Sequence, residues 1–159
     1  MQKLKKNLAV SYGAFASGDT DLAIKSLVTA FCHHANGQWS QAEKLRTYQF
    51  LAWLYFCERR LTKTLDCLWK VLYLQEQLFG AGSPQIASTA FNLAEVCRQL
   101  GLYEQAETLY GRTLPIAVHS LGSAHPCCEV ISRRRQEMLG LRVKSDNRAS
   151  STLIHQSQR

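Results

Sequence analysis

Apolar residues recur along this chain mostly at intervals of three and four positions. After Leu61, for example, they fall at Leu65, Leu68, Leu72 and Phe79, which is the spacing of one face of an α-helix. No segment alternates apolar and polar residues for long enough to suggest a strand. The pattern predicts helices near 4–16, 20–34, 41–58, 61–79, 85–99, 103–119 and 127–139.

Prolines and glycines punctuate this pattern. Pro84 and Pro126 stand where a helix would begin, a position that tolerates a missing N–H, and Gly80 and Gly122 stand where a helix would end. Pro115 instead lies inside a predicted helix, which it should kink or shorten because it removes a backbone hydrogen bond. From residue 142 onward the periodicity is lost, and we expect disorder there.

The chain also repeats itself at a period of 42 residues. That shift pairs Thr47 with Thr89, Leu51-Ala52 with Leu93-Ala94, Leu72 with Leu114, Gly80 with Gly122, and Pro84 with Pro126. The matches keep one register, so we predict helix-pair units at about 4–36, 41–82 and 83–125. One helix pair cannot bury its apolar face alone, and such units therefore stack.

The predicted fold class is all-α, with about three helix pairs in a domain over 1–141 and a capping helix over 126–141. The last helix carries Arg135-Gln136 where the preceding unit has Leu93-Ala94. A polar pair at this position suits a terminal helix whose outer face meets water. The remaining residues, 142–159, are predicted to be a disordered basic tail.

Residues 83–126 resemble the 42-residue tetratricopeptide repeat of kinesin light chains. The resemblance rests on these matches: Asn92-Leu93-Ala94, Gly101, Tyr103-Glu104, Ala106-Glu107, Leu114, Ile116, Leu121-Gly122 and His125-Pro126. The two earlier units match more loosely. In the second unit Arg59 stands where the family has glycine, and Thr64 replaces alanine.

The resemblance implies a non-enzymatic scaffold or adaptor that binds a protein or peptide, in transport, cytoskeletal or signalling assemblies. Family precedent places the ligand against the first helix of each unit. The implied partner-binding residues are Arg46, Gln49, Trp53, Asn92, Glu95, Arg98 and Gln99. The alternative interpretation is that Trp53 belongs to the core and the others are ordinary surface.

The related repeats that bind chaperone tails carry a lysine and asparagine set at defined groove positions. Here the corresponding residues include Leu8, Tyr12, Gln49 and Trp53. Because that set is missing, chaperone-tail binding is not expected.

The distribution of charge along the chain suggests a second possible function. The net charge is +7, and residues 133–159 hold seven basic and two acidic residues, including Arg133, Arg134 and Arg135. A basic end of this kind can contact RNA phosphates. The rest of the chain is nearly balanced, so RNA binding is the alternative function and not the main one.

The cysteines and histidines give no firm sign of chemistry. An even count of six cysteines is compatible with disulfides, but four lie in apolar helical pattern, so a reduced, cytoplasmic location is simpler. Cys32-His33-His34 is a poor zinc site, because consecutive helical residues point about 100° apart. Without a phosphate-binding loop or nucleophile motif, we expect no cofactor and no enzymatic activity.

The N-terminus offers one competing interpretation. Lys3, Lys5 and Lys6 precede a short apolar stretch, as in a targeting peptide. That stretch is broken by Ser11, Tyr12 and Gly13, and the first predicted helix uses the same residues. No apolar run approaches the roughly 18 residues of a membrane span.

Overall fold

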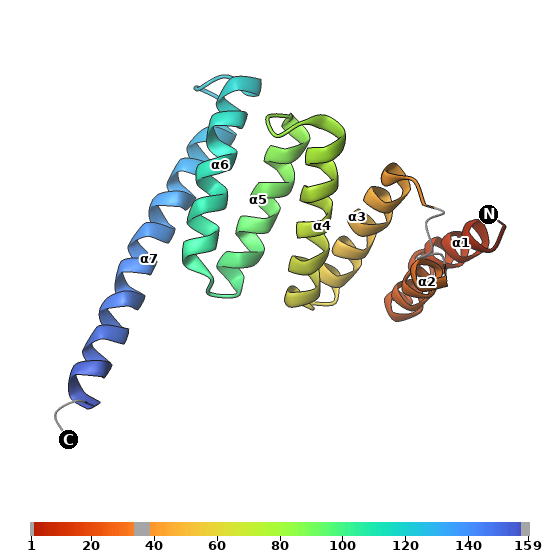
Figure 1. The fold of residues 1–159 in the computed structure, drawn as a ribbon, viewed down its shortest axis with the longest axis horizontal. Coiled ribbons are helices and arrows are strands. Elements are labelled where there is room, and N and C mark those ends of the chain that lie inside the picture. The colour runs from red at the N-terminus through yellow and green to blue at the C-terminus, as the bar shows by residue number, and fades with distance from the viewer. Residues whose placement is uncertain (1, 34–38, 157–159) are drawn as a thin grey trace. The chain divides into compact units, whose positions relative to one another are not determined.

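The computed structural model describes residues 2–33 and 39–156, with side chains over 8–32 and 39–144. These residues form seven α-helices and no strand (Figure 1). The helices are α1 (Gln2–Ala16), α2 (Thr20–His33), α3 (Gln41–Cys57), α4 (Leu61–Phe79), α5 (Pro84–Gln99), α6 (Tyr103–Leu121) and α7 (Pro126–Gln156). The predicted all-α repeat fold is confirmed, with three helix pairs followed by a further helix.

The helices gather into two compact units, where the sequence predicted one repeat domain. Unit 1, Met1–Gly80, holds the pairs α1–α2 and α3–α4, and unit 2, Ala81–Arg159, holds α5, α6 and α7. Within unit 1, Arg60 and Asp21 form an ion pair at 2.7 Å that ties the α3–α4 turn to α2. Thr20 donates a hydrogen bond to Glu58 across the same junction.

The turn inside each helix pair has the same backbone geometry. Gly18, Arg59 and Gly101 all take positive φ, at 86°, 56° and 76°. The next N–H in each turn donates to a carbonyl five residues earlier: Asp19 to Ala14 at 2.8 Å, Arg60 to Tyr55 at 2.9 Å, and Leu102 to Cys97 at 2.9 Å. Arg59 therefore adopts the left-handed conformation that glycine adopts without strain.

Small side chains mark the points where the two helices of a pair cross. In the second helices these are Ala23, Thr64 and Ala106, all essentially fully buried. The threonine that replaces alanine is accommodated because its hydroxyl donates to the Arg60 carbonyl at 3.1 Å. In the first pair, Ser11 also donates to the Ala23 carbonyl, at 2.8 Å.

The helix starts agree with the predicted signals. Pro84 and Pro126 are the first residues of α5 and α7. Ser40 caps α3 through a reciprocal pair of hydrogen bonds with Glu43. The Ser83 hydroxyl, by contrast, makes no capping bond to α5.

Pro115 does not shorten its helix. α6 passes through this residue and ends at Leu121, two residues beyond the predicted end. Tyr110, Thr113 and Ala117 are buried on both sides of the proline. Their packing holds the helix together although one backbone hydrogen bond is missing.

The last helix is longer than predicted, and the expected disorder from residue 142 is not what the structure shows. α7 continues to Gln156, beyond the start of α6 and the turn between α5 and α6 (Figure 1). No proline follows Pro126 in the chain, and the one glycine inside the helix, Gly140, costs only about 1 kcal/mol. The final residues of the predicted tail, 157–159, lie outside the described part.

Candidate functional site

In unit 1 the predicted binding residues share one face of α3. Arg46, Gln49 and Trp53 recur at helical spacing, and Phe50 lies beside them on the same face. Arg46 and Gln49 are exposed, and Trp53 keeps 44% of its surface open. The alternative interpretation placed Trp53 in the core, but the structure leaves it partly exposed.

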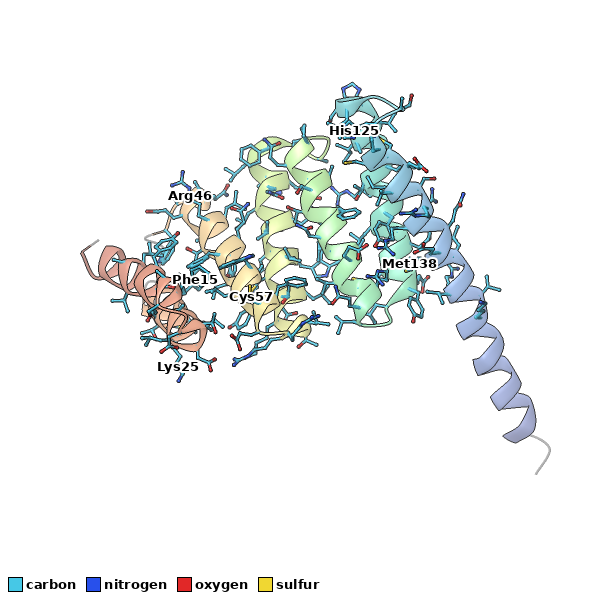
Figure 2. The ribbon with its side chains drawn as sticks, turned by 180° about the vertical axis from the view of Figure 1, so that it is seen from behind. Phe15, Lys25, Arg46, Cys57, His125 and Met138 are labelled. Atoms are coloured by element: carbon cyan, nitrogen blue, oxygen red, sulfur yellow. The ribbon has the colours of Figure 1, made fainter. Side chains whose placement is uncertain are left out.

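Trp53 belongs to a set of four rings that joins α1 to α3, which we call the aromatic stack: Tyr12, Phe15, Phe50 and Trp53. Tyr12 and Phe50 stack with centroids 4.7 Å apart, and Phe50 and Trp53 stack at 6.0 Å. Phe15, labelled in Figure 2, meets Trp53 edge to face at 4.5 Å. Tyr12 is 55% exposed, so the stack presents open aromatic surface at Tyr12 and at Trp53.

In unit 2 the predicted residues divide into two kinds. Asn92 and Gln99 of α5 are exposed. Glu95 and Arg98 are half-buried and bound to each other, with Arg98 Nη2 2.9 Å from Glu95 Oε2. Only the first kind is open to a ligand.

Glu95 is the centre of what we call the Glu95 network, formed with Arg98, Tyr110 and Arg134. The buried Tyr110 of α6 donates its hydroxyl to Glu95 Oε1. Arg134 of α7 places its Nε 3.4 Å from the same oxygen. One carboxylate therefore connects all three helices of unit 2.

The network shifts the acidity of its members. Partial burial alone would raise the pKa of Glu95, but hydrogen bonds from Tyr110 and Arg98 and the charge of Arg134 hold that pKa below its usual value. Burial, and then the bond to the Glu95 carboxylate, raise the pKa of Tyr110. The carboxylate is thus ionised and the phenol protonated at neutral pH.

The arginine triplet is largely occupied inside unit 2. Besides Arg134 in the Glu95 network, Arg135 donates to Glu107 of α6 at 2.9 Å. A β-carbon on Gly111 would lie 3.3 Å from Arg135 Nε, so the missing side chain gives the arginine its room. The Arg135 side chain is 44% exposed, as predicted for the outer face, and it is also paired with Glu107.

Phe50, Tyr110 and Arg134 were not among the residues predicted to form a binding site for a partner protein, and neither was Tyr12. Phe50 had a usable signal, because it follows Gln49 on a face already selected. Arg134 had none, since nothing in the repeat pattern indicates that a residue of the last helix reaches Glu95.

The described residues contain no group of three or more His, Cys, Asp and Glu side chains that could hold a metal ion. His34 of the rejected zinc candidate lies outside them. Burial raises the pKa of the Cys67 thiol to about 11, which suits a packing residue better than a nucleophile. Within the same residues, no helix is long and apolar enough to cross a membrane.

Comparisons with known proteins agree with this architecture. Residues 44–117 match the family model for the tetratricopeptide repeat. Two crystal structures of kinesin light chain TPR-like repeats from Podosopora anserina, in which the repeats are nearly identical to one another, each share 16% sequence identity with this chain. Their TM-scores are 0.66 and 0.65. They cover 91% of this chain and 68% and 69% of those chains.

Two further structures have the same fold. BtubC (BKLC) from P. vanneervenii is 18% identical over 86% of this chain and 59% of its own, with a TM-score of 0.61. The apo form of RapI is 15% identical over 95% of this chain and 60% of its own, also with a TM-score of 0.61. No curated protein matches the chain in sequence. At these identities the likeness is one of fold.

Proposed function

We propose that this chain, a tetratricopeptide repeat protein that resembles the kinesin light chain, is a non-enzymatic adaptor that binds a partner polypeptide through the aromatic stack of unit 1. The repeat fold is a scaffold fold and favours protein partners. Transport, cytoskeletal or signalling assemblies in the cytoplasm are the setting that the resemblance favours. The stack and the exposed Arg46 and Gln49 are the binding surface.

The open surface of Tyr12 and Trp53 is the observation that carries this proposal. Large aromatic side chains are enriched where partners bind most strongly, because they offer wide contact area at little entropic cost. Here their mutual stacking fixes the rings before any ligand arrives. Gln49 and Arg46 lie on the same face of α3 and supply polar groups for a peptide backbone and a carboxylate.

The test compares two tryptophans of similar exposure. Trp53 of the aromatic stack is 44% exposed and Trp69 of α4 is 42% exposed. Partners captured with the wild-type chain are produced in pure form, and their Kd is measured against wild type, Trp53→Ala and Trp69→Ala. Removing an aromatic anchor should weaken binding about thirtyfold, which corresponds to about 2 kcal/mol.

Trp69→Ala should bind as wild type does. Equal losses with both variants would contradict the proposal, since they would indicate a general effect on unit 1. Unchanged binding with Trp53→Ala would contradict it directly. Circular dichroism of each variant reports whether the helices are intact.

Nucleic-acid binding through the basic end is the alternative function. Two of its seven basic residues, Arg134 and Arg135, are engaged with Glu95 and Glu107. We therefore expect labelled RNA to bind weakly at physiological salt. Tight binding that falls steeply with salt, and is lost when the exposed Arg133 and Lys144 are replaced by glutamine, would support that function instead.

A further inference from the structure

The turn between α3 and α4 carries two arginines and, one residue farther on, a threonine. Arg59 and Arg60 are followed by Leu61 and Thr62, and the turn comes just after Cys57, which Figure 2 labels. The side chains of the two arginines and of the threonine are exposed. In the whole sequence, Thr62 is the one serine or threonine that has arginine both three and two residues before it.

Arg59 occupies its place in the turn at a conformational cost. Its φ is 56°, and the residues that take positive φ in the turns of the other two pairs are Gly18 and Gly101. Glycine adopts this conformation freely and arginine does not, because the β-carbon crowds the backbone. A residue held in an unfavourable conformation is a candidate for a functional role. The Arg59 guanidinium bonds to none of the described residues, so that role is directed outward.

The position of Thr62 is acidic in both other helix pairs. Three residues after the positive-φ residue of each turn stand Asp21 in α2 and Glu104 in α6. In α4 the first turn holds no acidic residue. Negative charge at this position favours the start of a helix, because the first N–H groups of a helix carry partial positive charge. A phosphate on Thr62 would supply the charge that the other two helices have by sequence.

The first turn of α4 can open at little cost. Arg60 is its N-cap residue and makes no side-chain capping bond. The first backbone hydrogen bond of the helix runs from the Thr64 N–H to the Arg60 carbonyl, at 3.0 Å. Segments with few backbone bonds open most readily, and opening also relieves the positive φ of Arg59. The Thr62 hydroxyl, which bonds to none of the described residues, can then enter the active site of an enzyme.

We propose that Thr62 is a phosphorylation site for a protein kinase that recognises arginines three and two residues before its target. Carboxylates of the kinase would bind the two guanidinium groups bidentately. The γ-phosphorus of ATP forms a bond to Thr62 Oγ1 while its bond to the bridging oxygen of ADP breaks, and a carboxylate of the kinase takes the hydroxyl proton. The products are phosphothreonine and ADP. The inference does not depend on the binding surface proposed for the aromatic stack.

The phosphate has a competitor inside unit 1. In the unmodified chain Arg60 is bound to Asp21 of α2 at 2.7 Å, and both side chains are exposed. A phosphate on Thr62 places about −1.5 to −2 charges two residues from Arg60 at pH 7. Because exposed ion pairs are weak, the phosphate should draw Arg60 away from Asp21 and loosen the junction between the α3–α4 turn and α2.

A kinase assay on the full chain tests the site. The probe is the catalytic subunit of the cyclic-AMP-dependent protein kinase with radiolabelled ATP, and mass spectrometry locates the phosphate. Wild type should be modified at Thr62 and Thr62→Ala should lose that site, while the exposed Thr108 of α6, which follows no arginine, should stay unmodified.

Arg59→Gly separates recognition from folding. This change relieves a positive φ, so a lower rate cannot come from a damaged fold. Loss of one charge-assisted contact to the kinase should lower kcat/KM at Thr62 about thirtyfold. Arg59→Lys, which keeps the charge but not the planar fork, should give a value between the two.

Hydrogen exchange measures the effect on Arg60. The phosphorylated chain should exchange about twofold faster in α2 than the unmodified chain, with no change in α6. Asp21→Asn removes the ion pair beforehand, so this variant should exchange faster in α2 already and should gain nothing further on phosphorylation.

Four results would overturn the inference. Phosphate found only on the serines that also follow arginines near the end of the chain, Ser145, Ser150 and Ser151, would place the site elsewhere. An equal rate with Arg59→Gly would show that this arginine is not recognised. Modification of Thr62 only in heat-unfolded chain would show that the turn does not open in the folded protein. Unchanged exchange in α2 after phosphorylation would contradict the release of Arg60 from Asp21.

Discussion

The two units link neighbouring helices in different ways, through aromatic rings in unit 1 and through an ion pair in unit 2. The 42-residue shift places Trp53 of unit 1 and Glu95 of unit 2 at the same repeat position. Trp53 reaches the neighbouring first helix through ring contact with Phe15, whereas Glu95 reaches α7 through its ion pair with Arg134. The repeat thus fixes which position links neighbouring helices, and leaves open whether the link is apolar or ionic.

The difference decides what each face can offer. An aromatic link still leaves open ring surface for a partner. The ionic link engages the polar groups of Glu95 and Arg98 with each other, so the two side chains offer less to a ligand than the open rings do. The next four predictions set the two units against each other.

The largest effect is expected from Glu95→Ala. This change leaves the buried Tyr110 hydroxyl and the charges of Arg98 and Arg134 without their shared partner, and should lower the free energy of unfolding by about 3 kcal/mol. Urea unfolding measures the loss, and hydrogen exchange should locate it in α5–α7. The exposed Asn92→Ala, as control, should change stability by less than about 0.5 kcal/mol.

A second change compares the second helices α4 and α6. The repeat places Pro115 of α6 where α4 has Tyr73. Pro115→Ala restores a backbone hydrogen bond to the Gly111 carbonyl, and should stabilise unit 2 by about 2 kcal/mol. Thermal unfolding checks this, and a lowered Tm would show that the proline fits its site without strain.

Low pH should destabilise unit 2 more than unit 1. The expected loss in the free energy of unfolding is smaller than that caused by Glu95→Ala. The pKa of Glu95 is lowered in the folded chain, so its contribution is complete above the unfolded carboxyl pKa of about 4.3 and is lost as pH falls through the lower folded value. Hydrogen exchange between pH 6 and 3 should show α7 loosening while the aromatic stack of unit 1 keeps its protection. Glu95→Gln should remove most of that pH dependence; a wild-type profile in this variant would assign the effect to other carboxyls.

The smallest effect concerns the turns. Arg59→Gly relieves a positive φ in unit 1 and should raise stability by about 1 kcal/mol, and the reciprocal Gly101→Arg should lower the stability of unit 2 by a similar amount. Both changes are measured by urea unfolding. If neither shifts the midpoint, the turn geometry would not carry the cost assigned to it.

Sequence patterns predicted the fold better than the site. Helix periodicity and the repeated Gly80 and Gly122 located most helix boundaries within two residues, because these signals are local. The Glu95 network was beyond prediction, because it joins side chains from three helices and depends on the docking of α7. The length of α7 was underestimated because loss of amphipathic pattern was taken as loss of helix, although no residue there stops one.

Gly111 of α6 has a consequence for how α7 packs, because it has no side chain at the point where Arg135 of α7 lies. Arg135 enters the space that a side chain would fill and is anchored on Glu107 behind it. A register shift of one residue would rotate the position of this arginine by about 100° around the axis of α7, away from Gly111. This contact favours one register of α7 along α6, and the ion pair between Arg134 and Glu95 and the buried Ile131 and Met138 support the same register.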